Sequence, residues 1–212
     1  TITAFLFSRP AHISEQFKTA ENILMIDQGG GSTEFTLYDN DTHIKGSYSL
    51  NLGTTVLKTI LFRESTEHTT INNALKNATQ LIKERLRTLN NSKESVFLHN
   101  KKIDRTISVG TAITKATGKK GNKKQHGTIL KLQRLEELIT EVDDKLQLKY
   151  HYISDLLYDL ELKNAYADRL DGDIVMRIGL IMYIEIMKNF NIDELIVSGT
   201  GLWYGIYYKQ LH

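Results

Sequence analysis

Apolar runs and alternating positions in the first quarter of the chain are typical of β-strands. Residues 23–26 form an apolar run that stops at Gly29, and apolar residues then recur at alternating positions over 35–37 and 44–50. The turn sequence Asp39-Asn40-Asp41 separates these last two segments. Alternation with a period of two places every second side chain on one face of a strand, and Asp and Asn favour turns. We therefore predict a meander of three strands.

Longer apolar patterns in the rest of the chain follow the spacing of helices. Residues 70–90 and 130–146 each carry one apolar face, whereas residues 174–190 are apolar on nearly every side, which predicts a buried helix. The shorter predicted elements are strands at 103–109 and 195–197, a short helix at 112–116, and a terminal helix after Gly201. Strands that alternate with long helices predict an α/β fold, here with a mixed five-stranded sheet and helices on both faces.

The composition is that of an ordinary globular domain. Of the 212 residues, 41% are apolar and 25% are charged, and no apolar run is long enough to cross a bilayer. The net charge of +2 indicates neither a nucleic-acid nor a membrane partner, so we expect neither. The absence of cysteine fits a reducing compartment, and we expect a cytoplasmic protein. The first residue is Thr1 and no signal peptide pattern follows, so we expect a segment upstream of it.

The candidate chemistry lies in the segment Asp27-Gln28-Gly29-Gly30-Gly31-Ser32-Thr33-Glu34, called the glycine loop below. Three consecutive glycines let backbone amides approach a phosphate closely, and Ser32 and Thr33 add hydroxyl donors. Asp27 and Glu34 flank the loop, so both carboxylates can reach a divalent metal or a water beside the phosphorus. Because the loop joins two strands, it is neither a Walker loop nor a dinucleotide fingerprint. The alternative is a glycine-rich β-turn with a solvated Glu34.

The segment 26–35 resembles the phosphate loop that opens the second domain of the exopolyphosphatase / guanosine pentaphosphatase family, within the actin, heat-shock chaperone and sugar kinase superfamily. Four further segments agree with the family in order and spacing: Leu50 to Thr55, Val109 to Thr114, Ala167 to Gly172, and Val197 to Gly205. The resemblance implies a ribonuclease-H-like α/β domain over residues 21–212, with residues 1–20 leading into it from a first domain.

The resemblance also implies roles for individual residues. Asp27 and Glu34 would be catalytic and would hold Mg²⁺, or another divalent cation, together with the attacking water. The implied phosphate ligands are Gly29, Gly30 and Ser32. From the residues themselves we also expect Gly31 and Thr33 to hold phosphate, and Gly110 and Thr111 to form a second anion-binding turn; the alternative is that Gly110 simply ends a strand. The implied reaction releases terminal phosphate from polyphosphate or guanosine pentaphosphate. The sequence leaves the oligomeric state open, and a homodimer is one of the states we consider.

The chain departs from the family pattern at several positions. It lacks the family's first Asp-x-Gly-Ser loop, and the resemblance aligns the family's catalytic Glu with Thr3, whose hydroxyl cannot act as a carboxylate base. Trp203 and Tyr204 replace a cation and an anion of the family. These changes favour an alternative in which the protein binds nucleotide or polyphosphate as a sensor. A sugar or acid kinase relative is a third alternative.

Other charged residues have a structural interpretation beside a functional one. The loop around Gly118 is rich in lysine, at Lys115, Lys119, Lys120, Lys123 and Lys124. Such a patch would attract a polyanion, or it is simply a solvated loop. Arg177, inside the predicted buried helix, is expected to be a paired structural ion.

Overall fold

The computed structural model describes residues 17–39, 41, 43–64, 68–99, 101–118, 125–147, 150–155 and 167–199. Its centre is a six-stranded sheet with the strand order β3-β2-β1-β4-β6-β5. The strands are β1 (Ile23–Gln28), β2 (Thr33–Tyr38), β3 (Ile44–Leu50), β4 (Arg105–Val109), β5 (Thr128–Lys131) and β6 (Glu194–Val197).

The first three strands form the predicted antiparallel meander, which is thereby confirmed. β4 and β6 continue the sheet in parallel with β1, and β5 closes it antiparallel to β6. The sheet is mixed, as predicted, but the expected number of five strands was wrong because β5 was missed. This strand has four residues and leads directly into a helix, so its Leu130 had been assigned to the apolar face of that helix.

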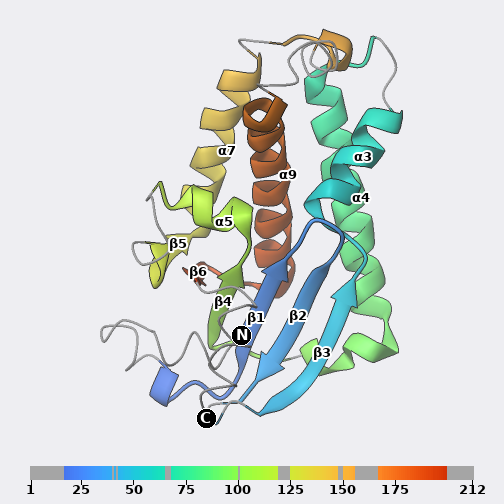
Figure 1. Ribbon diagram of the computed structural model, residues 1–212. Coiled ribbons are helices and arrows are strands. Elements are labelled where there is room, and N and C mark those ends of the chain that lie inside the picture. The colour runs from blue at the N-terminus through green and yellow to red at the C-terminus, as the bar shows by residue number, and fades with distance from the viewer. Residues whose placement is uncertain are drawn as a thin grey trace.

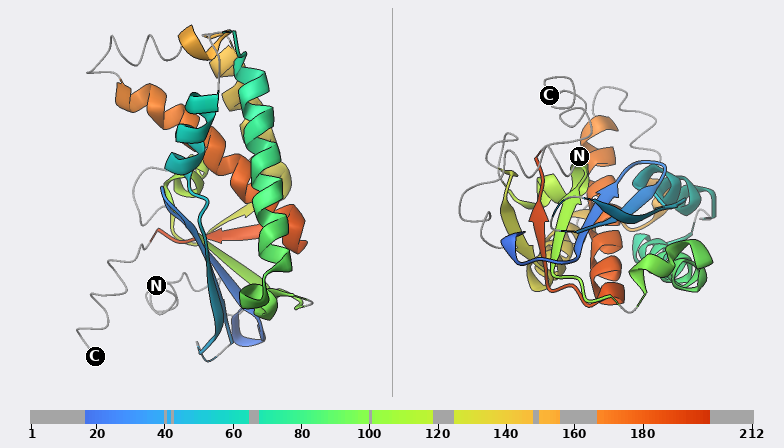
Figure 2. Two further views of the ribbon diagram at one scale, coloured as in Figure 1. Left: turned by 90° about the vertical axis from the view of Figure 1, so that its right-hand side faces the viewer. Right: turned by 90° about the horizontal axis from the view of Figure 1, so that it is seen from below.

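The five helices named below pack on one face of the sheet, as Figures 1 and 2 show. The opposite face is covered, in the described residues, only by the segment around Phe17 and Ala20, so the predicted cover of helices on both faces is not found there. The five helices are α3 (Thr54–Glu64), α4 (Ile71–Asn91), α5 (Thr111–Ala116), α7 (Leu132–Gln147) and α9 (Ala167–Phe190), with a 3-10 helix η1 at Lys93–Leu98. α4, α5, α7 and α9 confirm the predicted helices, and α9 is the buried one. α4 begins where Thr70 accepts a hydrogen bond from the amide of Asn73 (3.3 Å), a normal helix cap.

Alternation along β1 decides which face each site residue occupies. Leu24 and Ile26 belong to the large core between sheet and helices, whereas Ile23 and Met25 belong to a smaller cluster on the opposite face. Phe17 contributes to that second cluster. Because side chains alternate along a strand, Asp27 lies on the second face and Gln28 on the helix face. The predicted terminal helix lies outside the described residues.

Arg177 of α9 forms a bidentate ion pair with Asp143 of α7. Arg177 is buried, and its partner lies on the neighbouring helix. The prediction of a paired structural ion is confirmed. Over the ranges that the structure describes, none of the helices, α9 included, has the length and apolar character that crossing a bilayer requires.

Candidate functional site

Two glycine turns lie side by side at the carboxyl ends of the parallel strands, which are called the carboxyl edge of the sheet below. β1 ends at Gln28 and β4 ends at Val109, and the two ends are neighbours because Asp27 pairs with Val109. The glycine loop follows β1 and Gly110 follows β4, so both turns lie at this edge (Figure 1). Open α/β sheets bind their ligands at the carboxyl ends of the strands, which makes this edge the candidate site.

The start of α3 holds the glycine loop in place. The amide of Thr54 donates to the carbonyl of Gly29 (3.1 Å). The amides of Thr55 and Val56 both donate to the carbonyl of Gly30 (2.9 and 3.2 Å). The first amides of a helix have no partner within the helix itself. Loop and helix therefore satisfy each other, and the two loop carbonyls point toward α3.

The amides of the glycine loop differ in their hydrogen bonding. The amide of Gly29 closes the turn by donating to the carbonyl of Ser32 (2.9 Å). Within the described ranges, however, the amides of Gly30, Gly31 and Ser32 have no hydrogen-bond partner. Gly30 and Gly31 are exposed. Backbone amides grouped in this way form an anion-binding site.

Gly53 allows the loop and α3 to approach each other closely. A Cβ atom at this position would lie 2.3 Å from the carbonyl oxygen of Gly30 and 2.6 Å from the carbonyl carbon of Gly31. A Cβ atom on Gly31, by contrast, would meet nothing within 4 Å. The loop is thus packed tightly on the side of α3 and open at Gly31.

Asp27 and Glu34 face each other directly across the β1–β2 ladder. Both side chains are partly buried. Burial, and then the neighbouring charge of Glu34, raise the pKa of Asp27 above its ordinary value. One oxygen of Glu34, Oε1, accepts hydrogen bonds from Ser32 Oγ (2.5 Å) and Ser49 Oγ (3.0 Å). The structure therefore brings together the two carboxylates that the sequence singled out.

The two hydroxyls of the loop are already engaged by the protein. Thr33 is fully buried, and its Oγ1 donates to the carbonyl of Leu52 (2.7 Å). The hydroxyl of Ser32 donates to Glu34. Their contacts with phosphate remain predictions, and for Ser32 the backbone amide is the better placed donor.

Helix α9 supports the second turn, which consists of Gly110 and Thr111. Gly110 has φ +138°, and a Cβ atom there would lie 2.7 Å from the carbonyl oxygen of Gln28, so glycine is required. The carbonyl of Val109 accepts a hydrogen bond from the buried hydroxyl of Tyr183 (2.6 Å). Thr111 is exposed at the start of α5. Gly110 and Thr111 thus lie at the same edge as the glycine loop, and their binding of an anion remains a prediction.

Gln28 connects the loop to the helical layer. Its side chain is buried, and Nε2 donates to the carbonyl of Gly179 in α9 (3.1 Å). A Cβ atom on Gly179 would lie 2.8 Å from Gln28 Oε1, so this contact also depends on glycine. Gln28, Tyr183 and Ser49 are not predictable as site residues from the sequence. Their functional contacts come from elements distant in sequence, and no local pattern marks them.

The chemistry of the carboxylate pair fits Mg²⁺. This cation is usually bound by one or two carboxylates, with water and substrate phosphate oxygens completing its octahedron. The part of the chain that the structure describes has no group of three or more His, Cys, Asp or Glu side chains able to hold a metal. Asp27 and Glu34 therefore suit a metal ion that binds together with phosphate.

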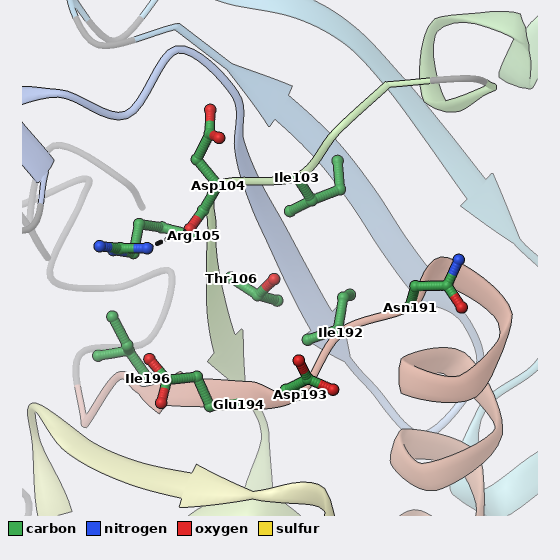
Figure 3. Close-up of a pocket in the computed structure, with 9 residues that line it drawn as sticks. All are labelled: Ile103, Asp104, Arg105, Thr106, Asn191, Ile192, Asp193, Glu194 and Ile196. Carbon is green, nitrogen blue, oxygen red and sulfur yellow. Dashed lines mark hydrogen bonds between the residues drawn. The ribbon is translucent and has the colours of Figure 1, made fainter.

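A separate cavity of about 300 Å³ lies at the other end of the parallel strands, where β4 and β6 begin. It is lined by polar side chains at the amino ends of β4 and β6, among them Asp104, Asp193 and Glu194, while Arg105 points away from these acids (Figure 3). Asp104 already accepts hydrogen bonds from the amides of Glu21 and Asn22. The glycine loop lies at the carboxyl edge, so this cavity is not part of the candidate site.

Several predicted features fall outside the described residues. They are Thr3, the pair Trp203 and Tyr204, and the lysines Lys119, Lys120, Lys123 and Lys124.

Comparison with known proteins gives a family match. The chain matches the Ppx/GppA phosphatase family over residues 10–212. No curated protein matches it significantly.

Several solved structures are similar to this chain in fold. They include the type II variant of the Aquifex aeolicus Ppx/GppA phosphatase (18% identity, TM-score 0.66), an exopolyphosphatase-like protein (17%, 0.62) and a Cytophaga hutchinsonii exopolyphosphatase (17%, 0.61). The matches cover 99%, 99% and 98% of this chain but only 62%, 66% and 62% of the other chains. The chain thus spans less than two thirds of the length of these relatives. At such identity the likeness shows the fold alone, and it confirms the predicted ribonuclease-H-like α/β class.

Proposed function

Since the chain belongs to the Ppx/GppA phosphatase family, we propose that it forms half of a Mg²⁺-dependent hydrolase that releases terminal phosphate from polyphosphate or guanosine pentaphosphate. One observation carries the proposal. Unpartnered loop amides stand between Asp27 and Glu34 in sequence, and these carboxylates face each other across the ladder. Hydrolysis of a phosphoanhydride needs donors for the phosphate oxygens and oxygen ligands for a metal and water, and this loop offers both.

In the proposed reaction the loop binds the terminal phosphate and the carboxylates orient the water. The proposed phosphate-binding residues are Gly29, Gly30, Gly31, Ser32, Thr33, Gly110 and Thr111. Among the loop residues, the amides of Gly30, Gly31 and Ser32 are the donors that the described part of the chain leaves available, while Gly29 and Thr33 hold the shape of the loop. Asp27 and Glu34 hold Mg²⁺, or another divalent cation, whose charge neutralises the phosphate oxygens when it is bound. The water oxygen bonds to phosphorus as the bond from phosphorus to the bridging oxygen breaks. The shortened polyphosphate or nucleotide leaves on that oxygen, which takes up the proton that the water loses.

The opposite wall of the site is proposed to come from a preceding domain, with residues 1–20 leading from it and residues 21–212 forming the phosphate-binding domain. The family resemblance implies an active site between two domains. We therefore expect the 212 residues alone to release phosphate only slowly. The substrate would bind between the two domains, and closure would exclude bulk solvent while the attacking water stays beside the phosphate.

A second function keeps the binding and omits the hydrolysis. It is favoured by Thr3, which stands where the family resemblance places a carboxylate base. Such a protein would sense polyphosphate or a phosphorylated guanine nucleotide and respond by domain closure.

Phosphate release from polyphosphate by the complete protein with Mg²⁺ tests the proposal. The double variant Asp27→Ala/Glu34→Ala is compared with Glu137→Ala/Glu141→Ala, which removes two carboxylates that are about half exposed on α7 and makes the same change in charge. We expect the first variant to lose on the order of 10²-fold or more in rate, and the second to match wild type. Equal phosphate release by both variants would contradict the proposed hydrolase function. Tight binding of polyphosphate by a wild type that releases nothing favours the sensor.

A further inference from the structure

Serine hydroxyls occupy one of the two carboxylate oxygens of Glu34. Oε1 accepts a hydrogen bond from Ser32 Oγ (2.5 Å) and another from Ser49 Oγ (3.0 Å). A carboxylate oxygen offers about two lone-pair sites, so these two hydroxyls fill Oε1. In the ranges covered by the structure, Oε2 has no hydrogen-bond partner. Oε2 is therefore the oxygen left to bind a ligand.

The two serines reach Glu34 from different parts of the fold. Ser32 belongs to the glycine loop, directly before β2. Ser49 lies on β3 and is the residue directly opposite Glu34 in the antiparallel ladder, so the two side chains share a face of the sheet. A strand within a sheet is a more rigid support than a loop that binds a ligand. Ser49 is thus the fixed anchor of the pair.

A glutamate needs such an anchor at this position. Its side chain has three rotatable bonds, and at a partly exposed site it samples several rotamers unless a contact selects one. Hydrogen bonds to an ionised acceptor are roughly twice as strong as bonds between neutral groups. Two of them on one oxygen fix both the position of the carboxylate and its rotation.

We propose that Ser49 is a positioning residue for Glu34, and that its hydroxyl directs Oε2 toward the metal and the water of the reaction. This inference rests on the proposed function, because it needs a ligand at Oε2. Ser49 acts through Glu34 and touches no substrate. Ser32 supports the same carboxylate with its hydroxyl, so its backbone amide remains as its donor to phosphate.

Ser47 offers a matched control on the same strand. It lies two residues before Ser49 on the same face, is exposed like Ser49, and pairs with Thr36 instead of a carboxylate. Its Oγ lies 3.2 Å from Thr36 Oγ1. Ser47→Ala removes the same chemical group from the same strand without affecting Glu34.

Steady-state kinetics of the complete protein on polyphosphate with Mg²⁺ test the assignment. We expect Ser49→Ala to lower kcat about tenfold and to keep KM within about twofold, because the amides that bind phosphate are untouched. Ser49→Thr keeps the hydroxyl and should restore at least about half of the wild-type kcat. Ser47→Ala should change neither constant. A loss that is the same for Ser49→Ala and Ser47→Ala overturns the assignment.

A double-mutant cycle shows whether Ser49 acts through Glu34. In the Glu34→Ala background, Ser49→Ala should cause no further loss, since the group to be positioned is gone. A loss of the same size in both backgrounds means that Ser49 acts independently, and the inference then fails.

Binding of Mn²⁺ in the presence of pyrophosphate, followed by electron paramagnetic resonance, separates this inference from the proposed function. We expect Ser49→Ala to weaken Mn²⁺ binding severalfold, and Ser47→Ala to leave it unchanged. If wild type binds Mn²⁺ but releases no phosphate, the hydrolase proposal fails and this titration alone decides on Ser49. An affinity that Ser49→Ala leaves unchanged, or a wild type that binds no Mn²⁺, overturns the positioning role.

Discussion

The substitution Gly53→Ala should separate the glycine loop from helix α3. Its Cβ atom would lie 2.3 Å from the carbonyl oxygen of Gly30 and 2.4 Å from the carbonyl carbon. Both are backbone atoms and cannot rotate away, so the loop and the helix must move apart by about 1 Å to reach van der Waals contact. That movement lengthens the hydrogen bonds from the amides of Thr54, Thr55 and Val56 to the loop.

The expected cost of Gly53→Ala combines strain and lost hydrogen bonds. Overpacking a tight site costs about 1–3 kcal/mol, and a backbone hydrogen bond contributes about 1 kcal/mol. With one or two of the three bonds lost, the free energy of unfolding should fall by about 2–5 kcal/mol. At about 2–4 °C per kcal/mol for a domain of this size, a loss of about 3 kcal/mol lowers Tm by about 6–12 °C.

Urea unfolding followed by circular dichroism measures this loss of stability. Titration calorimetry measures the affinity of the loop for pyrophosphate. Gly31→Ala is the control, because its Cβ atom meets nothing within 4 Å. We expect its stability to stay within about 0.5 kcal/mol of wild type, while its methyl group on the open side weakens pyrophosphate binding. A Gly53→Ala variant as stable as wild type would mean that close contact does not hold the loop and the helix together.

Two further predictions concern buried charge. Because burial and Glu34 raise the pKa of Asp27 above its ordinary value of 3.8, the folded state keeps this proton to higher pH than the unfolded state does. The stability of the wild type is therefore reduced as pH rises through the raised pKa. In metal-free buffer, thermal unfolding should show Asp27→Asn to be more stable than wild type at neutral pH, with the gain vanishing toward about pH 3; a variant that is less stable at neutral pH contradicts this. Asp143→Ala leaves the buried Arg177 without its carboxylate and should cost about 3 kcal/mol in urea unfolding. Arg177→Met combined with Asp143→Leu should recover most of that loss, and an equal loss in both variants would argue against a buried-charge penalty.

Sequence periodicity predicted the elements whose two faces have different surroundings. β2 and β3 alternate because one face meets the helical core, and α4 shows a clear apolar stripe for the same reason. β1 is instead a continuous apolar run, because both of its faces are buried. α3 was missed because its deeply buried residues are few, chiefly Leu57 and Leu61, and the polar residues between them leave no clear period. β5 was missed because four residues are too few to show alternation before α7 begins.

The candidate site was predictable only where it is continuous in sequence. Asp27 and Glu34 flank one loop, and the hairpin between β1 and β2 necessarily brings them together. Ser49 and Gly53 reach the loop from β3 and the start of α3, and Tyr183 supports the second turn from α9. A serine, a glycine and a tyrosine have no distinguishing local pattern, so only the tertiary structure assigns them to the site.

The glycine loop is proposed to bind phosphate, and the carboxylate pair to bind its metal. A crystal of the complete protein grown with pyrophosphate and Mn²⁺ tests both at once, because the anomalous signal locates the metal independently of the phosphate. We expect one Mn²⁺ ion bonded to oxygens of both Asp27 and Glu34, with pyrophosphate oxygens against the amides of Gly30 and Gly31. A metal ion bound elsewhere, for example at the acidic cavity beside Asp104, together with a glycine loop free of phosphate, would contradict the account.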